Sequence, residues 1–122
     1  MRQLFVVGAG LVALAVVAGA FGAHALAGRL TPERLATWET AARYHMYGSF
    51  SVVLASLAGA RWPSSLAANA GWVLVAGTVV FGGTVYLLAL GGPRWLGAVT
   101  PLGGLGLIVG WLLLGLAVWR AS

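Results

Sequence analysis

Four long stretches without a charged residue make up most of this 122-residue chain. They are residues 3–28, 44–60, 62–93 and 95–119, and every Arg and Glu lies between them or at an end of the chain. The hydrocarbon core of a bilayer is about 30 Å thick, and roughly 20 apolar residues in a helix cross it. The pattern therefore predicts an all-α integral membrane protein whose main solvent is lipid.

The composition leaves little material for a water-facing domain. Charged residues make up 7% of the chain, against about 25% in soluble domains. We therefore expect residues 1–122 to form a single transmembrane helical domain. The net charge of +5 comes from Arg residues scattered at the ends of the apolar stretches, so we expect contact with lipid headgroups and no nucleic-acid binding. The absence of cysteine excludes disulfides and thiolate metal sites.

The breaks between stretches predict a four-transmembrane-helix bundle with helices over about residues 4–26, 32–60, 66–90 and 101–119. Thr31-Pro32 is typical of a helix start, because Thr caps the first turn and Pro needs no hydrogen-bond acceptor there. Thr100-Pro101 has the same chemistry and is expected to begin the last helix. The start of the second helix is amphipathic, with Glu39 and Arg43 at i,i+4 spacing, so it either projects from the bilayer or lies in the interface.

Two local patterns have alternative interpretations. Arg2, the following apolar run and Ala23-His24-Ala25 resemble a cleavable signal peptide, but the length of the run and the later spans favour a retained helix. Gly106 and Gly110 form a GxxxG motif that suits either a dimer face or close packing inside the chain. We favour packing inside the chain.

Charge predicts the orientation of the chain only through a small excess. Positive residues mark the cytoplasmic side of a membrane protein. The side of the first and third connections carries Arg29, Arg34, Arg43 and Arg94, and the side of the two termini carries Arg2, Arg61 and Arg120. The excess of one arginine favours the first and third connections in the cytoplasm and both termini outside.

Several strings of residues are similar to one known family. They are residues 19–26, Trp38, residues 44–47, residues 81–90 and residues 94–104. The chain resembles the domain-of-unknown-function 423 family of small bacterial membrane proteins, whose relatives include transmembrane protein 256. The resemblance implies a multi-pass, four-helix protein of the bacterial inner membrane and implies no activity. Gly48 stands where relatives often carry a His, which weakens any role for a histidine pair there.

A first candidate site comprises polar residues at the junction of the first two helices. They are His24, Glu39, Arg43, Tyr44 and His45. Polar residues at membrane depth are costly and are therefore candidates for function. Two imidazoles could ligate haem or a metal, and His24, His45 and Glu39 could form a proton relay. The interpretation we favour is that both histidines hydrogen-bond neighbouring helices.

A second candidate site lies around the third connection. It comprises Gly82, Gly83, Thr84, Tyr86, Arg94 and Trp95. The glycines allow close backbone approach, and the Thr and Tyr hydroxyls can donate hydrogen bonds. Residues 91–99 are either partly re-entrant, which requires cover by protein or water, or a helix-breaking loop in the interface.

The residues favour no enzyme. The chain has no Asp, its two Glu residues are six positions apart, and no phosphate-binding loop is present. No metal site and no cofactor is predicted. We expect a small accessory or scaffold protein that packs in a homo-oligomer or a larger membrane complex. The alternative is a small-solute or proton transporter, or a channel-like oligomer, that uses His24, His45 and Glu39.

Overall fold

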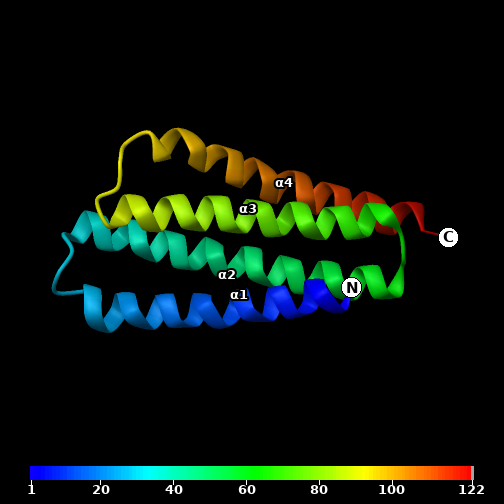
Figure 1. Ribbon diagram of the computed structural model, residues 1–122, viewed down its shortest axis with the longest axis horizontal. Coiled ribbons are helices and arrows are strands. Elements are labelled where there is room, and N and C mark those ends of the chain that lie inside the picture. Colours follow the sequence, from blue (N-terminus) through cyan, green and yellow to red (C-terminus); the bar gives the residue numbers. More distant parts are fainter. Residues whose placement is uncertain (122) are drawn as a thin grey trace.

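The computed structural model describes residues 1–121, and residue 122 of the predicted domain lies outside the described residues. The secondary structure of these residues is helical: α1 (Arg2–Phe21) continues into the π-helical turn η1 (Gly22–Leu26), followed by α2 (Pro32–Arg61), α3 (Ser65–Ala89) and α4 (Leu96–Arg120). Successive helices run antiparallel (Figure 1). They form a flattened bundle, in which α1 packs on α2, α2 on α3 and α3 on α4, while α1 barely touches α3.

Capping residues define the start of two helices. Thr31 accepts a hydrogen bond from Arg34 N at 3.2 Å, and Pro32 occupies the first helical position, as the Thr-Pro pattern predicted. Ser64 caps α3 in the same way by accepting a hydrogen bond from Ala67 N at 3.0 Å. Gly91 follows the end of α3 with a φ of +93°, a left-handed conformation that glycine adopts without steric cost.

The predicted start of the fourth helix was wrong. The helix α4 begins at Leu96, so Pro101 lies inside it and Thr100 is not its cap. Turn-type hydrogen bonds from Leu96 N to Pro93 O (3.1 Å) and from Gly97 N to Arg94 O (3.1 Å) form the first turn earlier. Pro101 then lies in the second turn of α4, where it donates no backbone hydrogen bond. Residues 96–99 are helical.

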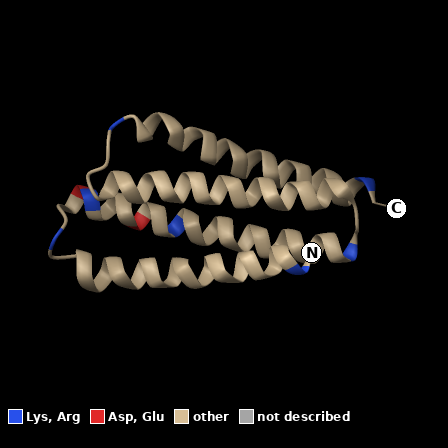
Figure 2. Cartoon of the chain, viewed as in Figure 1, with Lys and Arg blue, Asp and Glu red and all other residues tan. Residues whose placement is uncertain are grey.

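Among the described residues, three helices are long and apolar enough to cross a membrane: Arg2–Leu26, Ser65–Ala89 and Leu96–Arg120. The helix α2 does not meet this description, because its first turns carry charged residues and its uncharged part, 44–60, is short and contains His45 and three serines. Figure 2 shows that the charges lie at the two ends of the bundle and along the first part of α2. Length and composition thus give three spans, where the sequence predicted four.

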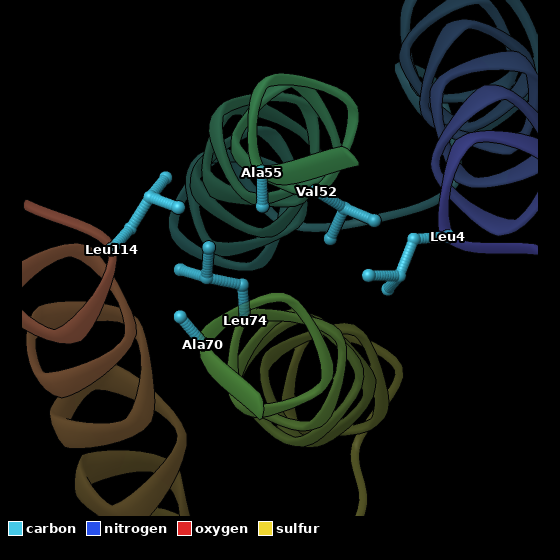
Figure 3. Packing of buried hydrophobic residues seen from close by; sticks show 6 residues of the cluster. All are labelled: Leu4, Val52, Ala55, Ala70, Leu74 and Leu114. Atoms are coloured by element: carbon cyan, nitrogen blue, oxygen red, sulfur yellow. The ribbon is translucent and has the colours of Figure 1, made fainter. Parts of the chain in front are cut away.

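The core lies between α2 and α3. Its buried cluster consists of Leu4, Val52, Ala55, Ala70, Leu74 and Leu114, and side chains from all four helices point toward one another there (Figure 3). Apolar contact of this kind in lipid depends on close packing more than on exclusion of water.

The helices α3 and α4 meet through what we call the glycine interface, formed by Gly77, Gly103, Gly106 and Gly110. A Cβ on Gly77 would lie 2.8 Å from Leu107 N and 2.9 Å from Gly103 O. A Cβ on Gly106 would lie 3.1 Å from Gly77 Cα. The GxxxG motif therefore packs inside the chain, which confirms the interpretation that the sequence favoured.

Candidate functional site

His45 is a buried polar residue that links α2 to α3. It lies on α2 and is 8% exposed. Its Nδ1 is 2.9 Å from the hydroxyl of Tyr86 on α3. Leu11 of α1 lines the same small cleft as the imidazole.

Trp38 occupies the same face of α2, seven residues before His45. Its Nε1 donates a 2.8 Å hydrogen bond to the carbonyl oxygen of Ala18 on α1. Its ring lies 4.6 Å from that of Tyr86 and 6.0 Å from that of Phe21, measured between centroids. We call these four residues, Phe21, Trp38, His45 and Tyr86, the aromatic–histidine cluster.

The π-helical turn η1 adjoins this cluster. A Cβ on Gly22 would lie 2.6 Å from Trp38 Cδ1 and 2.7 Å from Nε1, so only glycine lets the indole come this close. The indole also shares the Ala18 carbonyl with the backbone N–H of Gly22. A side chain that competes for a helical carbonyl is a recognised cause of local departure from α-helical geometry.

A small cleft opens beside His45 between α1 and α3. It has a volume of about 180 Å³ and is lined by Leu11, Leu14, His45, Thr78, Val79, Gly82, Gly83 and Tyr86. It exists because α1 leans on α2 and barely touches α3. Its walls are apolar, and the polar atoms at its base are already hydrogen-bonded: Tyr86 to His45, and Thr78 to the carbonyl oxygen of Leu74 at 2.7 Å.

The structure does not bring the first candidate site together. His24, Glu39, Arg43 and Tyr44 are exposed, whereas His45 is buried. The predicted Glu39–Arg43 pair is absent from the described residues, since Arg43 Nη2 donates instead to Thr40 Oγ1 at 3.4 Å. Tyr44 packs its ring 5.1 Å from that of Phe81. Within residues 1–121, no hydrogen bond connects His24, Glu39 and His45, so the described chain contains no direct relay between them.

The second candidate site is divided between two contacts. Tyr86 bonds to His45, and a Cβ on Gly82 would lie 3.7 Å from His45 Cβ. Thr84 faces α4, where its Oγ1 lies 2.7 Å from Thr100 Oγ1. Gly83 borders the cleft with open space beyond it, and Arg94 and Trp95 are exposed in the connection before α4. The sequence thus assigned His45 and Tyr86 to separate sites, and they belong to one.

Sequence reasoning missed the role of Trp38 in this cluster. The signal was its spacing from His45, because residues seven apart lie on one face of a helix. The partners Ala18 and Tyr86 carried no comparable signal, since nothing local indicates which carbonyl or hydroxyl another helix will present.

The described residues contain no group of three or more His, Cys, Asp or Glu that could hold a metal ion. The two histidines have different surroundings: His24 is exposed, whereas His45 is buried and bonded to Tyr86. The geometry in this part of the chain therefore resembles a structural tie between helices more than a ligand site.

Comparison with known proteins identifies the family to which the sequence belongs. A family model described as a protein of unknown function, DUF423, matches residues 18–104. The chain belongs to the DUF423 family. The match includes the aromatic–histidine cluster and the first part of α4, and no solved structure matches the chain.

Three relatives of this DUF423 protein are bacterial and are named only as membrane proteins. UPF0382 membrane protein SAB0533 of Staphylococcus aureus is 36% identical over 121 residues, which cover 98% of each chain. UPF0382 membrane protein SERP0230 of Staphylococcus epidermidis is 42% identical over 118 residues, 96% of this chain and 95% of the relative. UPF0382 membrane protein YwdK of Bacillus subtilis is 39% identical over 90 residues, 73% of each chain. This DUF423 chain is therefore a membrane protein of a family with unknown function.

Gly48 of this DUF423 protein lies against Thr78 on α3. A Cβ on Gly48 would lie 2.9 Å from Thr78 Cβ and closer still to Thr78 Oγ1. A histidine at this position would not fit while Thr78 keeps its place.

Proposed function

We propose that the chain crosses the bacterial inner membrane four times and acts as a small accessory or scaffold protein within a homo-oligomer or a larger membrane complex. The observation that carries this proposal is the use of the interior polar groups. Among residues 1–121, no buried side-chain nitrogen or oxygen lacks a hydrogen-bond partner. Hydrogen bonds of this kind hold helices together, and they leave no buried polar group free to bind a substrate.

The polar content of α2 is compatible with a fourth span. Residues 44–60 rise about 25 Å as a helix, close to the thickness of the hydrocarbon core. The serines in this part, Ser49, Ser51 and Ser56, are buried and donate to carbonyls of their own helix. Arg43 can extend its guanidinium toward the headgroups while its stem stays in apolar surroundings.

The flanking helices supply surfaces for a partner. Within the apolar windows of α1 and α4, 17% and 22% of residues are buried, against 39% for α3. Leu14 on α1 is 60% exposed and Leu112 on α4 is 69% exposed. Both faces suit lipid or another membrane protein, and the proposal assigns at least one of them to a protein.

The membrane topology can be tested with single cysteines, because the chain has none of its own. We would introduce Gly28→Cys, Ser65→Cys, Gly97→Cys and Ala121→Cys, one at a time, and label them with a membrane-impermeant maleimide. Four spans with outside termini predict that positions 65 and 121 react in intact cells, and that positions 28 and 97 react only after permeabilisation. Labelling of positions 28 and 65 from the same side would show that α2 does not cross.

The accessory role can be tested by native mass spectrometry of protein extracted gently from its membrane. Gly10 on α1 and Gly115 on α4 have open space beyond the backbone, so Gly10→Leu and Gly115→Leu change a surface and leave the fold intact. We expect a wild-type mass above that of one chain and its loss in one of the two variants. A wild-type protein that is always a single chain without a protein partner would contradict the proposal.

A further inference from the structure

A second cavity lies at the end of the bundle that holds both termini. It has a volume of about 510 Å³ and lies where the turn between α2 and α3 meets the end of α4. Its lining includes Arg61, Trp62, Ser64, Leu66, Ala117 and Arg120. The cavity is distant in sequence from the aromatic–histidine cluster, and the accessory role does not use it.

Two arginines from separate helices line this cavity. Arg61 is the last residue of α2, and Arg120 is the last residue of α4. The acidic residues, Glu33 and Glu39, lie in the opposite half of α2. No acidic side chain of the described chain therefore neutralises the cavity, which attracts a ligand with negative charge.

The Arg61 side chain is held in place by an aromatic neighbour. Its Cζ lies 5.1 Å from the centroid of the Trp62 ring, within the range of a cation–π contact. Such a contact orients the guanidinium, and a planar guanidinium donates paired hydrogen bonds to phosphate oxygens. Ser65 and Leu66 also line the cavity, and their backbone N–H groups precede the first helical hydrogen bonds of α3.

Part of the remaining wall is apolar. Leu66 and Ala117 line the cavity beside the arginines. Trp62 and Trp119 are exposed at this end of α2 and α4, and tryptophan is typical of the boundary between lipid tails and headgroups. The occupant is therefore expected to carry a phosphate at this level and an apolar part along the bundle.

We propose that this cavity binds the phosphate group of an anionic phospholipid, with Arg61 and Arg120 as the binding residues. Arginine recognises phosphate through charge and paired hydrogen bonds, and this chemistry is available on either face of a bilayer. The binding would be separate from the accessory role, since either property can exist without the other. Inorganic phosphate carries the same phosphate group as the lipid but lacks an apolar part. An experiment that compares the two ligands therefore distinguishes them.

The test compares two double variants of the full-length chain. Arg61→Gln with Arg120→Gln removes both charges from the cavity. Arg29→Gln with Arg94→Gln removes the same charge from the opposite end, where both residues are exposed. Delipidated protein in neutral detergent is titrated with phosphatidylglycerol, phosphatidylcholine or inorganic phosphate, and native mass spectrometry counts the bound molecules.

We expect the wild type to retain one phosphatidylglycerol more tightly than phosphatidylcholine. Removal of both cavity arginines should weaken the binding of phosphatidylglycerol about 25-fold, from a contribution of about fivefold for each arginine near the membrane surface. The variant at the opposite end should bind within about twofold of the wild type. Circular dichroism and thermal unfolding should be unchanged in both variants, because all four arginines are exposed.

Two results would overturn the proposal. Equal weakening in both double variants would mean diffuse attraction to positive charge and no defined site. Displacement of phosphatidylglycerol by an equal concentration of inorganic phosphate would mean that the cavity selects free phosphate and that the apolar wall contributes nothing.

Discussion

Neighbouring helices are held together in two different ways in this protein. The helices α3 and α4 meet at the glycine interface, whereas α1, α2 and α3 meet at the aromatic–histidine cluster. In the first, backbone meets backbone, and a Cβ on Gly77 would lie within 3.0 Å of three backbone atoms of α4. In the second, large side chains from three helices interlock and their polar atoms pair, as His45 does with Tyr86. One contact excludes side chains, and the other depends on them.

The difference explains where the bundle has space. At the glycine interface, the backbones of α3 and α4 lie in direct contact. Bulky aromatic residues hold α1, α2 and α3 together at specific points and leave the cleft of about 180 Å³ beside His45. In lipid, where apolar residues gain little by leaving the solvent, close packing and hydrogen bonding are the available sources of stability. The glycine interface relies on close packing, and the aromatic–histidine cluster adds hydrogen bonds between helices.

The largest effect is expected at the glycine interface. Gly77→Val places a branched side chain against backbone atoms of Gly103 and Leu107, which cannot rotate away as a side chain can. We expect a loss of about 3 kcal/mol in the free energy of unfolding, measured by circular dichroism in detergent micelles. Gly83→Val is the control, because it lies on the same helix and faces open space. Equal losses in both variants would point to helix propensity and away from packing.

A smaller effect is expected when the indole of the aromatic–histidine cluster is removed. Trp38→Phe loses the hydrogen bond to Ala18 O and part of the contact with Tyr86. We expect a cost of about 2 kcal/mol in the same unfolding experiment. Trp119→Phe, at a residue 86% exposed, should cost almost nothing. A neutral Trp38→Phe would show that the cluster is not a stabilising contact.

The hydrogen bond between His45 and Tyr86 is expected to contribute less than the indole. A double-mutant cycle of His45→Leu and Tyr86→Phe isolates the pair from the other contacts of each residue. Hydrogen bonds between helices in membranes are worth about 0.6 to 1.7 kcal/mol, and we expect a coupling free energy of about 1 kcal/mol. Strict additivity of the two single changes would mean that the 2.9 Å contact contributes no stability.

The smallest effect is expected at the one side-chain hydrogen bond described between α3 and α4. Thr100→Val removes the contact between Thr100 Oγ1 and Thr84 Oγ1 but leaves Thr84 bonded to the carbonyl oxygen of Val80 at 2.8 Å. We expect a cost of about 0.5 kcal/mol. Thr37→Val, which removes a hydrogen bond within α2 alone, is the matched control. A cost above that of Trp38→Phe would reverse our account of the two contacts.

The sequence was most informative where a single residue decides local geometry. Thr31-Pro32 predicted the start of α2, because capping depends on neighbours a few residues away. The same reasoning failed at Thr100-Pro101, because turn-type hydrogen bonds from residues 96–98 had already begun α4. A proline pattern describes what a position tolerates, and it does not exclude a helix that starts earlier.

The candidate site was only partly predictable. His45 and Tyr86 were both recognised as polar residues at membrane depth, but they were assigned to different sites. They are 41 residues apart, and the contact depends on how far α2 and α3 are rotated toward each other. Trp38 belonged to the same helix face as His45, yet its partner on α1 is a backbone carbonyl, which no side chain reveals.

The amino-acid sequence by itself determined that this chain is a helical membrane protein, because the absence of charge over long stretches leaves lipid as the natural solvent and helices as its structure. The tertiary structure decided which of its few polar and small residues meet. It turned the GxxxG motif inward against α3, joined His45 to Tyr86, and left His24 and Glu39 exposed. The reason is that apolar residues face lipid and protein equally well, so hydropathy alone does not specify how each helix is rotated, and close packing between specific residues does.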